Sequence, residues 1–144
     1  MHSSTIFLTG ATGFIGSHVV KVALAAGNRV RLSVRKKEQI KTLTSLFPSY
    51  ASLLEFVIIP DISKAEAFED VLQDVDYVLH LASPMPGKGD DFRTDYLEPA
   101  VDGTLSVLNA AKASNTVKRV VITSSVLACI PLGSINASDM CIKG

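Results

Sequence analysis

The sequence predicts an α/β fold in which helices cover both faces of a doubly wound parallel sheet. Short apolar runs rich in β-branched residues alternate along the 144 residues with longer amphipathic stretches, and this alternation is typical of a parallel sheet packed between helices. Five such runs occur, and right-handed crossovers then favour the strand order 3-2-1-4-5. Apolar residues make up 47% of the chain and charged residues 19%, which suits a buried core and excludes a disordered chain.

The five strands are expected where the apolar runs are short and rich in β-branched or aromatic residues. The first run stops at Gly10, which marks the turn out of the strand. Runs without polar interruptions, such as the third, are typical of strands buried on both faces. The expected strands cover residues 5–9, 30–34, 56–59, 77–79 and 119–123.

The helices are expected between these strands, and most of them have recognisable ends. Gly27 ends the first helix as a C-cap, and Pro48 ends the second. Ser63 and Glu66 form a capping box that opens a short third helix. The expected helices cover residues 14–26 and 37–47, a short stretch from residue 63, and residues 97–113. The buried face of the last helix is predicted from apolar residues at helical spacing, namely Leu97, Val101, Leu105 and Leu108.

Charge and cysteine content exclude several classes of protein. Fourteen Lys and Arg balance 14 Asp and Glu, whereas a nucleic-acid-binding domain usually carries a basic excess. No apolar run approaches the roughly 20 residues of a membrane span, and the first residues lack the pattern of a signal peptide. Cys129 and Cys141 are too few for a disulfide framework or a metal cage. We therefore expect no nucleic-acid or membrane partner, no metal, and a reducing, cytoplasmic location.

A glycine-rich turn joins the first strand to the first helix. Gly10, Gly13 and Gly16 follow the spacing G-x-x-G-x-x-G. Gly10 allows the tight turn, Gly13 lets the backbone approach a pyrophosphate, and Gly16 lets the helix pack closely. The N-terminus of the helix then presents unpaired N–H groups and a partial positive charge to phosphates. The turn therefore predicts a dinucleotide site, with a packing role alone as the alternative.

The end of the second strand favours NADP(H) over NAD. A chain that prefers NAD usually has an acidic residue there, about 20 residues past the glycines, to hold the ribose 2′-OH. Here the first acid is Glu38. Arg35 can pair with a 2′-phosphate through its planar guanidinium, and Lys36, Lys37 or Lys41 can add positive charge. The alternative is a solvated basic start of a helix.

Other candidate contacts follow the third, fourth and fifth strands, at the carboxyl edge where ligands of open α/β folds bind. Asp61 could accept a hydrogen bond from the adenine amino group, with a turn-capping role as the alternative. Ala82 is small enough to let a cofactor pass, and His80 before it is interpreted as a half-buried strand residue rather than a catalyst. Residues 123–125 place hydroxyls at the same edge.

Taken together, these residues resemble the extended short-chain dehydrogenase/reductases, and in particular the branch of dihydroflavonol 4-reductase, cinnamoyl-CoA reductase and the fungal aldehyde/ketone reductases. The matching segments occur in order between residues 4 and about 128, at residues 9–17, 30–35, 61–62, 80–85, 98–104 and 123–125. The resemblance implies a Rossmann NADP(H)-binding domain over residues 1–130, followed by an unassigned tail over residues 131–144. The cofactor contacts that motifs and resemblance together assign are Gly10, Thr12, Gly13, Phe14, Ile15, Gly16, Arg35, Lys36, Lys41, Asp61, Ile62, Leu81, Ala82, Ser83, Thr123 and Ser124.

The resemblance also implies an activity, that of an NADP-dependent oxidoreductase acting on a small-molecule carbonyl substrate, an aldehyde or a ketone. In such reductases NADPH gives a hydride to the carbonyl, and a Tyr donates the proton. A Lys in a Tyr-x-x-x-Lys motif lowers the pKa of that Tyr, because a phenol with a pKa of about 10 is a poor acid at neutral pH. A Ser orients the substrate oxygen, and the catalytic Ser maps to Ser125.

One part of this family pattern is missing from the printed sequence. The tyrosines are Tyr50, Tyr77 and Tyr96, all of which precede Ser125, and none has a Lys four residues later. The alternatives are therefore an NADP(H)-binding module or sensor without turnover, or another extended-family reaction. Sugar-nucleotide epimerisation and steroid dehydrogenation are such reactions, and the missing acid after the second strand weighs against the epimerase. The predicted fold stops after its fifth strand, which leaves an apolar edge that we expect to favour self-association.

Overall fold

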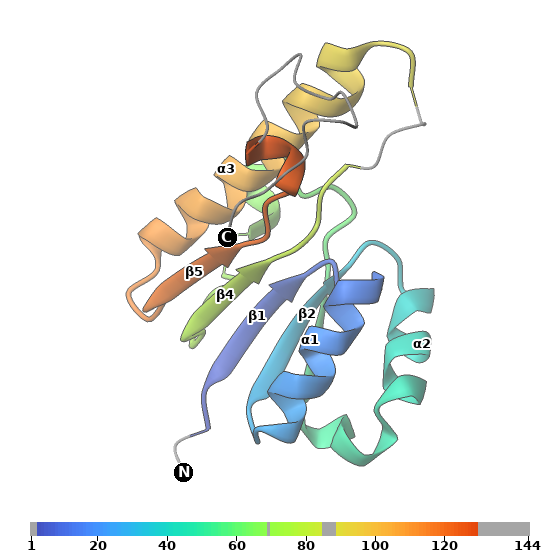
Figure 1. Cartoon of the computed structure of the whole chain (residues 1–144). Helices are drawn as coiled ribbons and strands as arrows, with labels where there is room; N and C mark the ends of the chain where they lie inside the picture. The colour runs from blue at the N-terminus through green and yellow to red at the C-terminus, as the bar shows by residue number, and fades with distance from the viewer. Residues whose placement is uncertain (1–2, 69, 85–88, 130–144) are drawn as a thin grey trace, which may run out of the picture.

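The sheet has the predicted topology. The computed structural model describes residues 3–68, 70–84 and 89–129, so the expected tail over residues 131–144 lies outside the described residues, as does Cys141. All strand pairs are parallel and the order is β3-β2-β1-β4-β5 (Figure 1), which confirms the α/β fold and the predicted order. The strands are β1 (Thr5–Thr9), β2 (Arg29–Val34), β3 (Leu54–Ile58), β4 (Tyr77–His80) and β5 (Arg119–Ile122).

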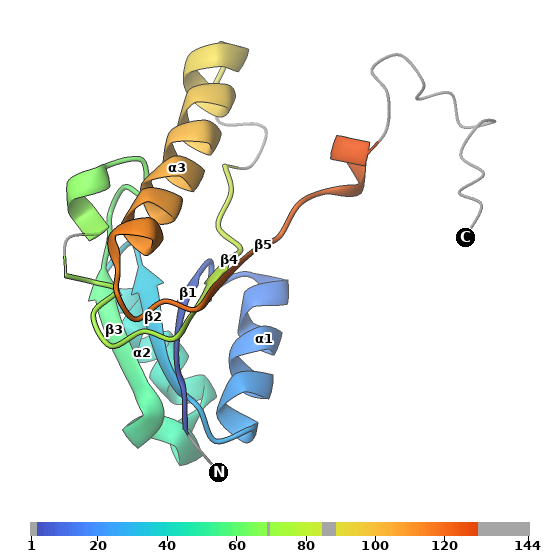
Figure 2. The same ribbon diagram turned by 90° about the vertical axis from the view of Figure 1, so that its left-hand side faces the viewer.

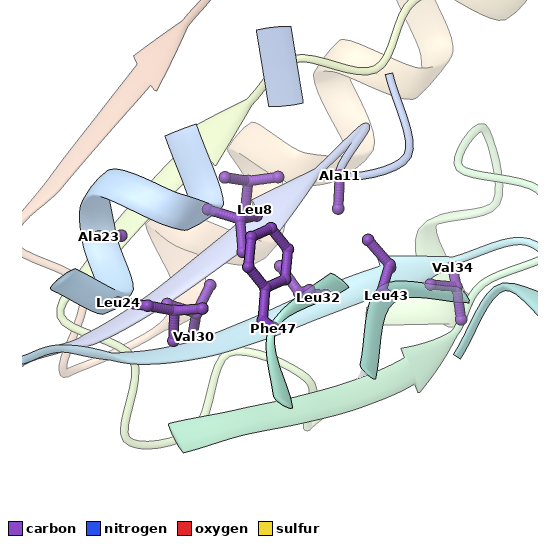
Figure 3. Close-up of a cluster of buried hydrophobic side chains, with 10 residues drawn as sticks. Leu8, Ala11, Ala23, Leu24, Val30, Leu32, Val34, Leu43 and Phe47 are labelled. Atoms are coloured by element: carbon purple, nitrogen blue, oxygen red, sulfur yellow. The ribbon is translucent and has the colours of Figure 1, made fainter. Parts of the chain in front are cut away.

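One face of the sheet is covered by two α-helices and a 3₁₀ segment. Their apolar side chains meet those of β1 and β2 in a buried cluster (Figure 3), in which Leu8, Leu24, Leu32 and Leu43 are at most 1% exposed. Gly27 has φ of +82° and its N–H donates to the carbonyl of Leu24, as expected of a residue that ends a helix. The elements on this face are α1 (Phe14–Ala25), α2 (Glu38–Leu46) and η1 (Pro48–Leu53).

The opposite face carries the second half of the core. Figure 2 shows α1 and α3 on opposite sides of the sheet. Phe7 of β1 packs edge-to-face on Phe68, with ring centres 6.2 Å apart, and Val78 and Val107 are buried beside them. The elements on this face are η2 (Ala65–Phe68), the π-helical turn η3 (Arg93–Leu97) and α3 (Glu98–Ala113), and η4 (Val126–Cys129) follows β5.

The capping box predicted at Ser63 and Glu66 is wrong. The Ser63 hydroxyl donates instead to Oδ1 of Asp61 at 2.7 Å, and the following segment forms one 3₁₀ turn rather than an α-helix. A cap would use the Ser63 oxygen as the acceptor of a later backbone N–H, whereas here the side chain is held in a local turn with Asp61. The apolar residues of this stretch are nevertheless buried, namely Phe68, Val71 and Leu72.

The buried face predicted for α3 is also wrong. Leu97, Val101 and Leu105 are between 44% and 48% exposed. Small residues let α3 lie close to the loop after β3, because a Cβ at Gly103 would meet the Ile62 side chain at 3.1 Å. The helical spacing of residues in the sequence cannot tell this face of small residues from the predicted stripe of larger apolar residues. The residues that α3 buries are Gly103, Ser106, Val107 and Ala111.

Candidate functional site

The glycine-rich turn leaves β1 at the carboxyl edge of the sheet and enters α1. Gly10 has φ of +80°, a conformation that glycine adopts readily and other residues rarely do. A Cβ at Gly16 would lie 2.1 Å from the carbonyl oxygen of Gly10. The start of α1 can therefore lie against the turn only where no side chain intervenes, so both glycines have the structural roles that the spacing predicts.

Gly13 has a different environment, which leaves the N-terminus of α1 accessible. A Cβ at Gly13 would meet the Gly10 oxygen at 3.4 Å, an ordinary contact distance, so packing within the protein does not require glycine there. Gly13 is the N-cap residue, and no side chain among the described residues hydrogen-bonds to the first N–H groups of α1. These N–H groups and the positive end of the helix dipole are thus available to an anion.

The end of β4 lies directly against this turn. A Cβ at Gly10 would be 2.8 Å from the backbone nitrogen of Ala82. The Thr9 hydroxyl oxygen accepts the N–H groups of Leu81 at 3.2 Å and Ala82 at 3.1 Å, and it lies 2.8 Å from Nδ1 of His80. His80 is only 3% exposed rather than half-buried, and burial lowers its pKa. His80 is therefore a hydrogen-bonded core residue, in keeping with its interpretation as a non-catalyst.

The end of β2 forms the facing wall. Arg35 follows this strand and its side chain is exposed. The side-chain oxygen of Gln39 accepts the backbone N–H groups of Arg35 at 2.8 Å and Lys36 at 3.1 Å, which fixes the segment that carries Arg35. Gln39 was not among the predicted site residues. Its place in the first turn of a helix, four residues after Arg35, is the sequence feature that could have identified it.

Asp61 lies beyond the end of β3. Oδ1 of Asp61 accepts the backbone N–H of Ser63 at 2.9 Å and the Ser63 hydroxyl at 2.7 Å. These hydrogen bonds hold the pKa of Asp61 below its usual value, and the positive charges of Lys64 and Arg35 lower the pKa further. The turn-capping role that the sequence left open is thus present, on an ionised carboxylate near Arg35.

Two adjoining hollows of about 320 Å³ each lie along this edge of the sheet. They share Arg35, Ile62 and Ser83, so together they form one continuous groove from the glycine-rich turn to the start of α3. The predicted residues that line the groove are Gly10, Thr12, Gly13, Arg35, Asp61, Ile62, Leu81, Ala82 and Ser83. Lining residues that the sequence reasoning missed are Ser33, Val34, Gln39, Ile59, Pro60, Pro84, Asp95 and Pro99.

The other predicted residues do not line this groove. Gly16 is buried against the turn. Phe14 and Ile15 are exposed and border a separate hollow between α1 and the end of α2. Lys36 and Lys41 are exposed, as are the three hydroxyl residues after β5, which are Thr123, Ser124 and Ser125.

The NAD dependent epimerase/dehydratase family matches residues 6–135. The chain belongs to this family. This chain is similar to an uncharacterized oxidoreductase of Schizosaccharomyces pombe, with 44% identity over 129 residues. It is also similar to the NADPH-dependent methylglyoxal reductase GRE2 of Saccharomyces cerevisiae, with 37% identity over 142 residues. These matches cover 89% and 94% of this chain, but 38% and 41% of the relatives. The chain therefore spans about two-fifths of the length of these relatives.

Solved structures agree with this assignment. The crystal structure of yeast methylglyoxal/isovaleraldehyde reductase Gre2 complexed with NADPH matches with a TM-score of 0.80 and 38% identity, over 86% of this chain and 38% of that one. Vestitone reductase from alfalfa matches with a TM-score of 0.69 and 32% identity, over 85% of this chain and 36% of that one. The predicted resemblance to the extended dehydrogenases, and to their oxidoreductase members, is confirmed.

Two further findings concern membranes and metals. Within the part of the chain that the structure describes, no helix is long and apolar enough to cross a membrane. In the same residues, no three His, Cys, Asp or Glu side chains are grouped so that they could hold a metal ion. Cys129 is an exposed free thiol.

Proposed function

We propose that the groove binds NADP(H). The observation that carries this proposal is the placement of an accessible helix N-terminus at one end of a continuous groove, with the exposed guanidinium of Arg35 at its rim. A dinucleotide with an extra phosphate needs two anion sites, and the N–H groups of α1 and the side chain of Arg35 can supply them. The NADPH complex of the similar reductase Gre2 supports this assignment.

The residues of the groove fit such a cofactor in chemistry and in space. The backbone at Gly13 carries no Cβ and leaves room for a pyrophosphate beside the start of α1. Arg35 would take the 2′-phosphate. Asp61 and Ile62 would contact the adenine, while Leu81, Ala82 and Ser83 would line the path of the cofactor past β4. Contacts from the remaining predicted residues stay predictions, namely those of Thr12, Phe14, Ile15, Gly16, Lys36, Lys41, Thr123 and Ser124.

As an activity we propose reduction of a small-molecule aldehyde or ketone by the full-length protein. NADPH, when bound, supplies the hydride for the carbonyl carbon. In this proposal Ser125 orients the carbonyl oxygen, and a Tyr and a Lys from polypeptide outside these 144 residues provide the proton. The names of the similar ketoreductase of Aspergillus fumigatus and of the yeast methylglyoxal reductase support the reaction class.

The test of cofactor binding is a calorimetric titration of the chain with NADPH and, in parallel, with NADH. We expect NADPH to bind more tightly, and Arg35→Ala to weaken NADPH much more than NADH. Loss of a charge-assisted bidentate contact costs on the order of 1.5–3 kcal/mol. Lys112→Ala is the control, because Lys112 is an exposed basic residue in the last turn of α3 and does not line the groove. Equal weakening of both cofactors by Arg35→Ala would refute the 2′-phosphate assignment, and no binding of either cofactor would refute the proposed function.

A binding module without turnover is the second candidate function. The printed sequence contains no Tyr-x-x-x-Lys, so these residues alone lack the proton donor of the family. NADPH oxidation with an aldehyde present distinguishes the two candidates. NADPH oxidation by the 144 residues alone would contradict the proposal that a Tyr and a Lys from outside them provide the proton. Binding without turnover, with turnover regained in a longer chain that carries the motif, would support the reductase.

We also propose that β5 allows self-association of the chain and that the protein is cytoplasmic. Within the described part of the chain β5 pairs with β4 alone, and Val121 and Ile122 are 49% and 42% exposed. An apolar edge strand presents unpaired backbone groups to a second copy. Light scattering over a wide concentration range tests the first point, because a monomer throughout would refute it. The free thiol of Cys129 suits a reducing compartment, and cell fractionation tests the location.

A further inference from the structure

A buried polar pair lies beneath the point where the glycine-rich turn meets the end of β4. Thr9 is 0% exposed and His80 is 3% exposed. The two residues are register partners in the parallel pairing of β1 with β4. Each immediately precedes part of the groove, since Gly10 follows Thr9 and the segment 81–83 follows His80. Any change in this pair is therefore transmitted to the groove by only one or two peptide units.

The hydrogen bonds of the pair determine where its protons lie. The Thr9 hydroxyl oxygen has two lone pairs and one proton. The N–H groups of Leu81, at 3.2 Å, and of Ala82, at 3.1 Å, occupy the lone pairs. The single proton is left for Nδ1 of His80 at 2.8 Å. The Leu81 N–H is shared with the Thr9 carbonyl oxygen at 3.3 Å, and this arrangement favours acceptance at Nδ1 by a neutral His80 ring that carries its proton on Nε2.

These bonds bring two backbone segments closer than ordinary side chains would allow. The site of a Cβ at Gly10 is 2.8 Å from the nitrogen of Ala82 and 3.0 Å from the carbonyl carbon of Leu81. A hydroxyl one residue before Gly10 binds those same two residues by their N–H groups. The backbone N–H of Thr123 in turn donates to the carbonyl of His80 at 2.9 Å, which joins the end of β5 to the same network. The Thr9 hydroxyl thus adds side-chain hydrogen bonds to the backbone pairing of β1 with β4, in which the Leu81 N–H also donates to the Thr9 carbonyl at 3.3 Å.

We infer that Thr9 and His80 are positioning residues, which fix the seat of the cofactor pyrophosphate by holding the glycine-rich turn against residues 81 and 82. This inference rests on the proposed NADP(H) function. Neither side chain lines the groove, so neither is assigned a contact with the cofactor. The pair acts through the backbone of Gly10 and Ala82, which do line the groove.

The test compares shape-matched variants in the whole 144-residue chain. Thr9→Val keeps the branched shape but removes the hydroxyl, and we expect the Kd for NADPH to rise about tenfold or more, as for loss of a buried hydrogen-bond partner. Thr9→Ser restores the hydroxyl and should remain within about threefold of the wild type. His80→Leu should weaken binding like Thr9→Val, whereas His80→Asn retains an acceptor near the position of Nδ1 and should recover most of the affinity.

Two controls separate positioning from general stability. Val107→Ala removes buried apolar contact on the same face of the sheet and should lower the free energy of unfolding without changing NADPH affinity. A proton–nitrogen NMR correlation of the His80 ring, which needs no cofactor, should show Nδ1 without a proton and Nε2 with one. Hydrogen exchange at Ala82 should accelerate in Thr9→Val more than in Val107→Ala.

The outcomes distinguish this inference from the proposed function. If the wild type binds NADPH and Thr9→Val binds it equally well, the positioning role is refuted while the proposed function stands. The same holds if Val107→Ala loses as much affinity as Thr9→Val, or if His80 carries a proton on Nδ1. If the wild type binds no NADPH, the proposed function fails and the positioning role fails with it.

Discussion

The strands β2 and β5 both carry branched apolar residues and differ in how deeply they bury them. Both begin with Arg, but β2 alternates apolar with polar residues whereas the rest of β5 is apolar. In β2, between β3 and β1, Val30 and Leu32 are 0% exposed. In β5, at the edge of the sheet, Val121 is 49% exposed and none of the four residues is buried. A strand's composition indicates that it belongs to a sheet, whereas its position decides how much apolar surface it buries.

The difference between central and edge strands also separates the groove from the predicted catalytic residue Ser125. The groove lies where the central strands β1, β2 and β4 end, with Asp61 and Ile62 added from the end of the edge strand β3, and hydrogen bonds such as those of Thr9 and Gln39 fix its central walls. Ser125, the predicted catalytic residue, follows the edge strand and is exposed. A site built on central strands is held by neighbours on both sides. Among the described residues, those after β5 follow a strand that pairs with β4 alone.

The largest expected effect is on core packing, where the two strands should respond very differently. Leu32→Ala in β2 should lower the free energy of unfolding by about 2–5 kcal/mol, because it leaves a cavity in a closed cluster. Val121→Ala in β5 should cost less than about 1 kcal/mol, since Val121 is half exposed. Urea unfolding measures both. Equal losses would mean that β5 is covered in solution, for example by a second copy.

The next effect concerns the glycine-rich turn. Gly16→Ala should lower the free energy of unfolding by about 1–3 kcal/mol, because the added Cβ meets backbone and cannot be accommodated by a side-chain movement. Gly13→Ala is the matched control and should change stability little, since its Cβ would make only an ordinary contact. Gly13→Ala should still weaken NADPH binding if the pyrophosphate lies there. A large loss of stability in Gly13→Ala would contradict the assignment of a packing role to Gly16 and a binding role to Gly13.

A smaller effect comes from the charges that join β2 to β3. Burial raises the pKa of Glu55, but hydrogen bonds and positive charge from Arg31 and Arg29 outweigh it and hold the pKa below its usual value. This stabilisation is complete above the unfolded pKa of 4.5 and disappears as the pH falls through the lower folded value. Stability should therefore fall less on acidification in Glu55→Gln than in the wild type. Urea midpoints from about pH 6 to pH 3 measure this, with exposed Glu38→Gln as the control.

The smallest effect on stability is expected from a charge placed on the exposed edge. Ile122→Lys should leave the free energy of unfolding within about 0.5 kcal/mol of the wild type, because the side chain is already 42% exposed. It should nevertheless reduce self-association, since lysine on an edge strand opposes pairing with another strand. Analytical ultracentrifugation measures the second effect. Unchanged association in Ile122→Lys would show that the chain associates through another surface.

Much of the fold could be predicted because each strand and turn carried its own local pattern. The runs that became β1 to β5, the turn at Gly10 and the helix end at Gly27 depend on neighbouring residues in the sequence. The faces of the helices were less predictable. The leucine spacing of α3 suggested a buried stripe, but contact between Gly103 and Ile62 turned the small-residue face inward.

The candidate site shows the same limit. The glycines, Arg35 and Asp61 were found because motif spacing and residue chemistry identify them directly. Gln39 and Thr9 were missed because their roles consist of hydrogen bonds to the backbone of other segments. The predicted cap at Ser63 failed for a related reason, since both the backbone N–H and the hydroxyl of Ser63 bind Asp61 in a local turn.

By itself the sequence determined the α/β class, the strand order and the segments from which a dinucleotide groove is built. Those properties follow from apolar periodicity, turn glycines and the handedness of crossovers, all of which act over short stretches of chain. Only the tertiary structure decided that His80 is buried against Thr9, that Arg35 and Asp61 border one groove, and that β5 lies at the edge of the described sheet. These facts depend on which strands become neighbours, and burial and hydrogen-bond partners are fixed only once that packing is complete.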